Sequence, residues 1–159
     1  MSDQNSTKPQ MENAPIFRLQ KMYLKDLSFE SPHSPQVFMG QQVNPKVDIN
    51  LALNKKKLDD DHHEVAISIT ANVNDASGKT LFVVEVEHAG VFMLKNIPDE
   101  HIHTVLMVEC PALLFPFTRQ IVSQLSVDGG FTPFLMEPVN FFALYENAKR
   151  QGKDEQQKQ

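Results

Sequence analysis

This sequence is poor in cysteine and has no excess of basic residues. It has one cysteine, Cys110, so the chain cannot close an internal disulfide, and nothing points to an oxidising compartment. Its formal net charge is −5, which leaves it without the basic excess of a nucleic-acid-binding surface. We therefore expect basic or apolar partners, and no nucleic acid among them.

Long apolar runs are missing as well. The first 30 residues contain no run with the length of a signal peptide, and no segment approaches the length that spans a membrane. We therefore expect a cytoplasmic protein that does not insert into membranes. Hydrophobic residues still make up 41% of the 159 residues, which is enough for one folded domain of ordinary size.

One stretch, Ser77-Gly78-Lys79-Thr80, ends like a phosphate-binding loop. Such a loop also has a glycine five residues before Gly78, where this chain has Val73, and a helix after the lysine. Here the pattern predicts a strand after the lysine, so we interpret the stretch as a hairpin turn. No nucleotide or other cofactor is expected.

Catalytic and metal-binding patterns are equally incomplete. His62-His63-Glu64 lacks the second histidine of a zinc-binding helix, because position 67 is Ile67. Cys110 stands alone beside Pro111 in an apolar stretch, where a cysteine is usually a small core residue rather than a nucleophile. We therefore predict neither an enzyme nor a metal site.

Four stretches alternate between apolar and polar residues with a period of two, which is typical of β-strands. They comprise residues 16–30, 47–53, 64–73 and 80–94. The fourth carries apolar residues on both faces, which indicates burial on both sides. A loop with three prolines, residues 31–45, crosses between the first two strands. In the first strand one face is predicted to carry Phe17, Leu19, Tyr23, Leu27 and Phe29, and the other Arg18, Gln20, Asp26, Ser28 and Glu30.

Helices are predicted after the strands. Asp99 is a suitable N-cap for the first, which Pro111 and Pro116 interrupt before it resumes and ends at Gly129. Asn140 caps the last helix. The sequence thus predicts an α+β fold, a four-stranded antiparallel sheet with one face covered by two C-terminal helices. The domain comprises residues 15–148, and residues 1–14 and 149–159 are expected to be disordered tails.

Apolar side chains are also abundant outside the strands. The crossing loop contributes Phe38, Met39 and Val43, and the last helix contributes Phe141, Phe142 and Tyr145. These side chains could fill the core, or they could form a tolerant apolar binding surface. The pattern favours neither interpretation.

Four further features are the stretches YLKDLSFESPHSPQVF, VVEVEHAGVF, CPALLFPFTRQIV and DGGFTPFLMEPVNFFALYE. In their order and spacing they resemble the SecB family of preprotein-export chaperones. The resemblance covers about residues 16 to 147, and the block CPALLFPF followed by GGFTP and PVNF is its most specific part.

The resemblance implies an ATP-independent holdase that binds unfolded secretory preproteins in the cytoplasm, keeps them export-competent and hands them to the SecA motor. Proteins of this family assemble as a homotetramer, a dimer of dimers. The stretch Cys110–Arg119 would then belong to a long helix that packs on the sheet and helps to join dimers. Val84, Val86 and His88, which alternate on one face of the fourth strand, would lie at a subunit interface.

The family's client-binding groove lies between the crossing loop, the second strand and the last helix. Val43 stands where the family often has a tryptophan, so a less aromatic groove is expected here. The family docks SecA on an acidic sheet face, which corresponds here to Asp26, Glu30, Val83 and Glu85, and makes a second SecA contact with the last residues of the chain. Carried over, the groove consists of Phe38, Val43, Ile49, Leu51, Phe141, Leu144 and Tyr145.

Two other functions stay open on the sequence alone. A SecB-like chaperone dedicated to one partner, such as the antitoxin of a toxin–antitoxin pair, would have the same fold. A protein that binds a small apolar ligand could use the same groove. Binding of SecA would separate the first from a general export chaperone, and a defined mass bound to the purified protein would reveal the second.

Overall fold

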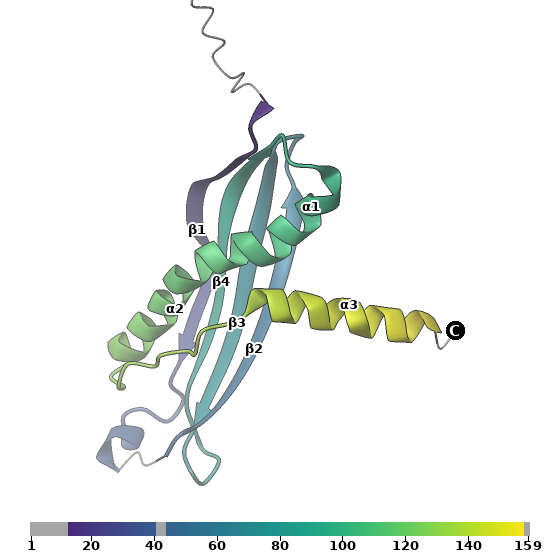
Figure 1. Ribbon diagram of the computed structural model, residues 1–159. Coiled ribbons are helices and arrows are strands. Elements are labelled where there is room, and N and C mark those ends of the chain that lie inside the picture. Colours follow the sequence, from purple (N-terminus) through teal and green to yellow (C-terminus); the bar gives the residue numbers. More distant parts are fainter. Residues whose placement is uncertain (1–12, 41–43, 158–159) are drawn as a thin grey trace, which may run out of the picture.

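The chain forms a four-stranded antiparallel sheet with helices on one of its faces (Figure 1). This is a computed structural model, and it describes residues 13–40 and 44–157. The predicted α+β fold is confirmed. The sheet order is β1-β4-β3-β2, with strands β1 (Ile16–Glu30), β2 (Lys46–Lys57), β3 (His62–Asn74) and β4 (Thr80–Lys95).

The helical segments follow β4, apart from a short 3-10 helix η2 (Gln36–Met39) in the crossing loop. A continuous rod, made of α1 (Asp99–Thr104), the π-helical turn η3 (Val105–Glu109) and α2 (Cys110–Asp128), runs across the sheet. The last helix, α3 (Phe141–Gln157), crosses the sheet towards β2 and extends past the edge of the sheet (Figure 1). Both lie on one side, so within the described residues the opposite face of the sheet carries no helix.

The two prolines do not interrupt the rod, contrary to the sequence-based expectation. In the π turn, the backbone N–H of Cys110 donates to the carbonyl of Val105, five residues back instead of four. This wider turn accommodates the Pro111 ring at the start of α2, where an α-helical turn would press the ring against a carbonyl. Pro116 lies inside α2 and the helix continues past it.

Cys110 is packed inside the chain, as predicted for a core residue. Its side chain is fully buried. Burial, with a smaller contribution from the charge of Glu109, raises the pKa of the Cys110 thiol to about 12. The thiol is therefore protonated at neutral pH and is a poor nucleophile.

The rod Asp99–Asp128 is 30 residues long and, by length and composition, contains a window apolar enough to cross a membrane. The expectation that no segment approaches this length is therefore wrong. However, 44% of its most apolar window is buried within the chain, where Leu114 and Val122 are fully buried against the sheet. Part of the rod is therefore packed into the core of the domain.

In strand β1 the faces to which successive side chains point are exchanged at two positions, which the period of two did not predict. Its pairing with β4 slips between Leu19 and Lys21 and again between Leu24 and Asp26. Each slip adds one residue to β1 and reverses the side-chain alternation beyond it. As a result Leu19 and Met22 both pack against the core, whereas Tyr23 lies on the face opposite Leu19, where it was not expected.

The core lies between the sheet and α2. On β3, the inward-facing side chains Val65, Ile67 and Ala71 are fully buried. Val84, Val86 and His88 of β4 face the same way and are only 0%, 3% and 3% exposed. The chain's own helix layer thus covers these three side chains, which the family resemblance placed at a subunit interface.

A buried polar pair helps to hold α2 on β4. The ring nitrogen Nδ1 of His88 lies 2.8 Å from the hydroxyl oxygen of Thr118, which also donates a hydrogen bond to the carbonyl of Leu114 at 3.2 Å. A buried imidazole is costly when charged, and burial lowers the pKa of His88 below its ordinary value of 6.5. The neutral ring is therefore the form that the fold favours.

Stability is expected to fall as the pH drops below about 6.5. The pKa values of His63, His88 and His103 are all lowered, in each case mainly by burial. The unfolded chain then binds more protons than the folded chain, so stability is complete above the ordinary histidine pKa and is lost below it. Urea unfolding followed by circular dichroism should give a lower midpoint at about pH 5.5 than at about pH 7.5.

The matched variant for this prediction is His88→Gln. Glutamine keeps a polar group near Thr118 but does not titrate, so the difference between the two midpoints should shrink. An undiminished difference in the variant would show that His88 contributes nothing to the acid sensitivity.

Helix α3 is longer than predicted. Asn140 caps it as expected, because its side-chain Oδ1 accepts the backbone N–H of Ala143 at 3.0 Å. The helix then continues to Gln157, through residues for which a disordered tail was expected. Lysine, arginine and glutamine are good helix formers, and Lys149 adds an ion pair with Glu146 at 4.0 Å.

Candidate functional site: an apolar groove along strand β2

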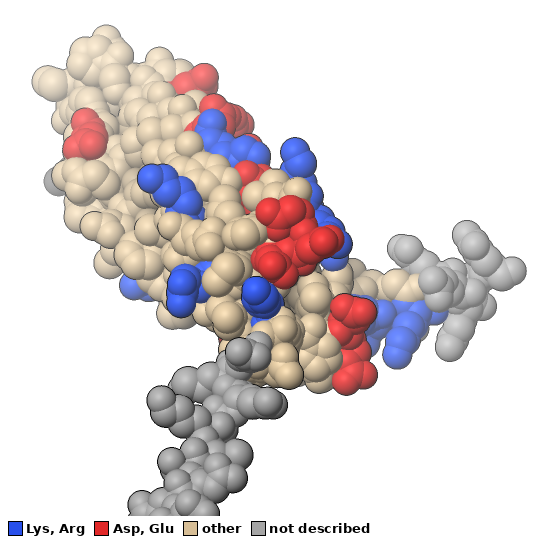
Figure 2. Space-filling model, turned by 90° about the horizontal axis from the view of Figure 1, so that it is seen from above, with Lys and Arg blue, Asp and Glu red and all other residues tan. Residues whose placement is uncertain are grey.

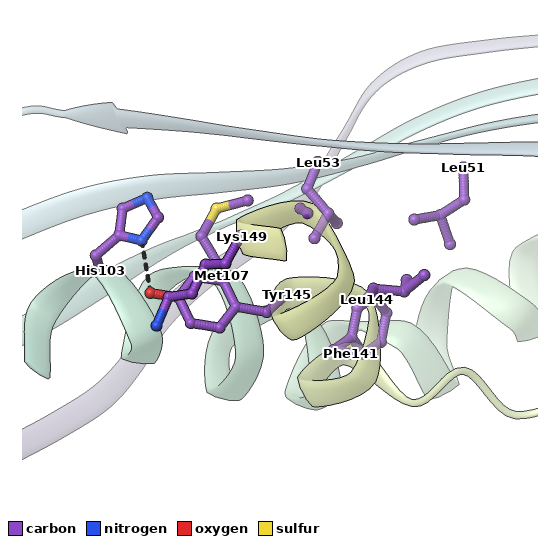
Figure 3. Close-up of a pocket in the computed structure, with 9 residues that line it drawn as sticks. Leu51, Leu53, His103, Met107, Phe141, Leu144, Tyr145 and Lys149 are labelled. Carbon is purple, nitrogen blue, oxygen red and sulfur yellow. Dashed lines mark hydrogen bonds between the residues drawn. The ribbon is translucent and has the colours of Figure 1, made fainter. Parts of the chain in front are cut away.

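An open groove runs along β2 on the face of the sheet that carries the helices. Its first hollow, about 440 Å³, lies between β2, the rod and α3 (Figure 3). Apolar side chains dominate the hollow, and polar groups gather at the end nearest α1. The lining residues are Leu51, Leu53, His103, Met107, Phe141, Leu144, Tyr145, Ala148 and Lys149.

Two further hollows continue the groove. A second, about 540 Å³, lies between β2 and the loop before α3 and shares Leu51 with the first. A third, about 180 Å³, lies at the start of β2 and shares Val47 and Phe134 with the second. Because neighbouring hollows share walls, they form one extended groove. The second is lined by Val47, Ile49, Leu51, Phe115, Phe134, Leu135, Met136, Glu137, Pro138 and Val139.

The floor of the groove is the inward face of β2. Val47, Ile49, Leu51 and Leu53 alternate along it, as the period of two predicts. Because β2 is an edge strand and the helices leave a gap over it, Val47 and Ile49 remain 42% and 41% exposed. Apolar side chains lined up in an open channel mark a surface for an apolar partner rather than a filled core.

The first hollow is closed at one end by a polar contact between α1 and α3. The Nδ1 of His103 and the hydroxyl of Tyr145 are hydrogen-bonded at 3.0 Å, and the Thr104 hydroxyl donates to the same oxygen at 3.4 Å. Lys149 lies over the Tyr145 ring, with its Nζ 4.4 Å from the centroid. Figure 3 shows His103, Tyr145 and Lys149 at one end of the hollow and Leu51, Phe141 and Leu144 at the other.

Most of the residues predicted for the groove come together in it: Ile49, Leu51, Phe141, Leu144 and Tyr145. Sequence reasoning missed His103 and Met107 of the rod, Phe134 of the loop, and Lys149. Lys149 had a readable signal, since it follows Tyr145 by four residues and so shares its helix face.

Two residues of the crossing loop, Phe38 and Val43, were also predicted to line the groove. Val43 lies outside the described residues. The Phe38 ring packs beside Phe131, with ring centroids 5.1 Å apart, and Phe131 in turn lines the third hollow. Gly130, with φ +89°, makes room for this packing, because a Cβ there would lie 3.1 Å from the Phe38 ring. Phe38 thus supports the far end of the groove from the side.

Comparison with known proteins shows the family to which this chain belongs. A family model described as preprotein translocase subunit SecB matches residues 10–152. The chain belongs to the SecB family. It is 61% identical to the protein-export protein SecB of Desulfotalea psychrophila over 142 residues, which are 89% of this chain and 91% of that protein. It is 46% identical to the protein-export protein SecB of Magnetococcus marinus over 138 residues, 87% of each chain.

A solved structure agrees with the fold. A SecB-like chaperone of Mycobacterium tuberculosis, in complex with a peptide from an antitoxin, superposes with a TM-score of 0.64. The match covers 77% of this chain and 90% of that chain at 15% sequence identity. At this identity the likeness extends to the fold, and it supports the order of strands and helices in this member of the SecB family.

The acidic residues predicted for the opposite face of the sheet lie together there. Glu30 pairs with Val83 across β1 and β4, and Ser28 pairs with Glu85. Asp26 follows on the same face, opposite Glu87. The view from above, along the sheet rather than onto this face, shows a further cluster of acidic side chains with lysine and arginine at its borders (Figure 2). The charge of the chain is therefore patterned rather than evenly spread.

An ion-paired network lies next to this patch on the same face. The Tyr23 hydroxyl donates to Oε2 of Glu64, and Lys25 Nζ lies 2.9 Å from Oε1 of Glu64 and 3.8 Å from Glu87. These contacts lower the pKa of Glu64, whereas burial and the Glu64 carboxylate raise the pKa of Tyr23 to about 12. Glu64 and Glu87 thus have cationic partners. Within the described residues Asp26, Glu30 and Glu85 make no ion pair.

Proposed function

We propose that this chain is an ATP-independent holdase that binds unfolded secretory preproteins in the cytoplasm and keeps them competent for export. The observation that carries the proposal is the uncovered apolar groove along β2, in a chain of the SecB family. Relatives up to 61% identical are named for protein export, which favours this role over a chaperone dedicated to an antitoxin.

The groove suits an extended client. An unfolded chain presents apolar side chains at short intervals, and three adjoining hollows offer a separate apolar contact for several of them. Removing this surface from water contributes about 25 cal/mol per Å². The groove is open along its length, so the client can enter and leave sideways without a nucleotide-driven step.

We propose further that the chain assembles as a homotetramer, a dimer of dimers, through the outer face of α2. Leu113 and Phe117 lie one helical turn apart and are 41% and 44% exposed on the side away from the sheet. An exposed apolar helix face of this kind is a self-association surface in many oligomers. Several grooves in one particle would multiply modest affinities, because binding of a second segment becomes intramolecular.

We also propose that SecA binds the acidic patch Asp26, Glu30, Val83 and Glu85. Support comes from its place on the face of the sheet opposite the groove, so a client and SecA can be bound at once. Its carboxylates without ion pairs would attract a basic partner surface. Transfer of the client then follows from SecA competing for the same unfolded chain.

An Ile49→Asp variant tests the proposed client binding. Ile49 is 41% exposed at the centre of the groove, so the fold tolerates a carboxylate there. An apolar client that covered this carboxylate would remove it from water without a partner, which is costly. We expect about tenfold weaker binding of an unfolded precursor, measured by titration, and a loss of aggregation suppression. Asp48→Asn, one residue away on the opposite face, is the control.

The circular dichroism spectrum and the sedimentation behaviour of the Ile49→Asp protein should match those of the unsubstituted protein. Undiminished client affinity in such a folded variant would place the binding surface elsewhere.

A further inference from the structure

We propose that the helix-free face of the sheet, opposite the groove, is a docking surface with two parts of opposite charge. The acidic patch is one part, and a cationic cluster made of Arg18, Lys21 and Lys95 is the other. The cluster binds an acidic segment of the same partner protein whose basic surface binds the acidic patch. Its role rests on the proposed docking of SecA, to which it adds a contact of opposite sign.

The three cations belong to successive residue pairs of β1 and β4 on this face. The pairs are Ile16 with Lys95, Arg18 with Met93, and Lys21 with Val91. Neighbouring side chains on one face of a strand are about 7 Å apart, so the Cα atoms of the three cationic residues lie within about 15 Å of one another. All three residues are exposed, and within the described part of the chain none of them makes an ion pair.

A covered strip separates the cationic cluster from the acidic patch. Tyr23 of β1 reaches across β4 and donates its hydrogen bond to Glu64 of β3. Ala89 and Ala66, which follow Tyr23 in the same row across the sheet, are 0% and 2% exposed although they face away from the helices. Lys25 adds an ion pair to Glu64 at 2.9 Å. The strip is therefore paired within the chain, and the charged surfaces lie on either side of it.

The charges of β1 and β4 are segregated by sign across this strip. Among the charged side chains of these two strands that face away from the helices, those on one side of the strip are cationic and those on the other side are anionic. The cationic residues are Arg18, Lys21 and Lys95, and the anionic residues are Asp26, Glu30, Glu85 and Glu87. Like charges gathered on neighbouring strands destabilise a sheet, so the fold gains nothing from this arrangement. Complementary charges on a bound partner would offset the repulsion.

The distance between the two parts constrains the partner. Met93, in the middle of the cationic pairs, and Glu85 of the acidic patch are eight residues apart on β4. This separation corresponds to about 26 Å along the strand, so the partner needs an acidic segment at about this distance from its basic surface. Two contacts of opposite sign also fix the direction in which the partner lies on the sheet, because the reversed direction would bring like charges together.

A protein fits this surface better than an anionic lipid surface does. Lipid headgroups would attract the cationic cluster, but they would repel the carboxylates of the acidic patch on the same face. A protein can present both signs of charge at the required separation. The partner is therefore a protein that carries an acidic segment beside a basic surface.

The double variant Arg18→Glu with Lys95→Glu tests the cationic cluster by titration with SecA at low salt. Affinity should fall about tenfold, because two attractive contacts with an acidic segment become repulsive. If SecA used the acidic patch alone, the added negative charge would leave its affinity unchanged or raise it. The matched control is Lys57→Glu with Lys79→Glu, which changes the net charge equally at the end of β2 and in the β3–β4 turn. It should not weaken the binding of SecA.

A cluster variant that binds SecA as tightly as the control variant would overturn the second contact. The variant Glu30→Lys with Glu85→Lys, titrated beside it, separates this outcome from a failure of the proposed docking, which unchanged SecA binding in that variant would indicate. Circular dichroism and binding of an unfolded client should be native in the cluster variant. If it does not fold, Lys21→Gln with Lys95→Gln removes two charges without adding any, and about threefold weaker SecA binding is then expected.

Sedimentation of the chain with vesicles of equal parts phosphatidylglycerol and phosphatidylcholine tests the lipid alternative. We expect no binding to these vesicles at physiological salt. Binding by the unsubstituted protein that the variant Arg18→Glu with Lys95→Glu loses would assign the cationic cluster to a lipid surface and overturn its assignment to a protein partner.

Discussion

A Val86→Asp chain is expected not to fold, with loss of the native circular dichroism signal instead of a smaller native assembly. Val86 is 3% exposed, paired with Leu27 on one side and Ile69 on the other, and lies under the helix layer. A carboxylate placed there would lie among the apolar side chains of the core. Burying it unpaired costs several kcal/mol, out of a total stability that for a domain of this size is about 5–15 kcal/mol.

The control for this prediction is Val83→Asp, on the same strand but on the helix-free face. There the new carboxylate can reach water, and its main cost is repulsion by Glu30 across the strand pair, at most about 1 kcal/mol. Thermal melts should therefore separate the two variants clearly. A Val86→Asp protein that kept the native spectrum as a dimer would instead show that Val86 acts between subunits.

The period-two stretches predicted the strands well where pairing is regular. In β2 and β3 the alternation runs without a slip over residues 46–57, so the inward placing of Ile49 and Leu51 followed from the sequence. In β1 two bulges reverse the alternation, and Tyr23 therefore faces away from the core. A bulge depends on how the neighbouring strand fits, which the residues of one strand do not reveal.

The helices show the same limit of local reasoning. Pro111 and Pro116 are helix breakers by their own chemistry, but the sheet holds the rod in place and a π turn absorbs the first proline. The first hollow depends on this turn, because Met107 lies within it and lines the groove. Tertiary packing thus decided a feature for which local propensity indicated an interruption.

The groove was predicted from family resemblance as a set of apolar residues, and its polar end was not predicted. His103 appeared in the sequence as one of several scattered histidines, and its partner Tyr145 lies 42 residues away. Only the packing of α1 against α3 brings these two and Lys149 together. A site formed by two elements that are far apart in the sequence is difficult to predict from the sequence alone.

Reversing Glu30 and Glu85 to lysine is expected to weaken binding of SecA about a hundredfold, as measured by titration at low salt. Both carboxylates lie on the helix-free face of the sheet, and within the described residues neither makes an ion pair. Reversal turns attraction of a basic partner into repulsion at two points, and close charge pairs between proteins are each worth about 1.5 kcal/mol or more. Client binding should change by less than about twofold, because the groove lies on the other face.

The matched control is Asp60→Lys with Asp128→Lys, which alters the net charge equally in the β2–β3 turn and at the end of α2. It should reduce SecA binding only slightly, through the long-range field, and high salt should remove that effect. The patch variant should keep its native melting temperature, since its substitutions lie on exposed or partly exposed positions of the sheet. Parallel loss of SecA binding and client binding would assign Glu30 and Glu85 to the stability of the sheet rather than to docking.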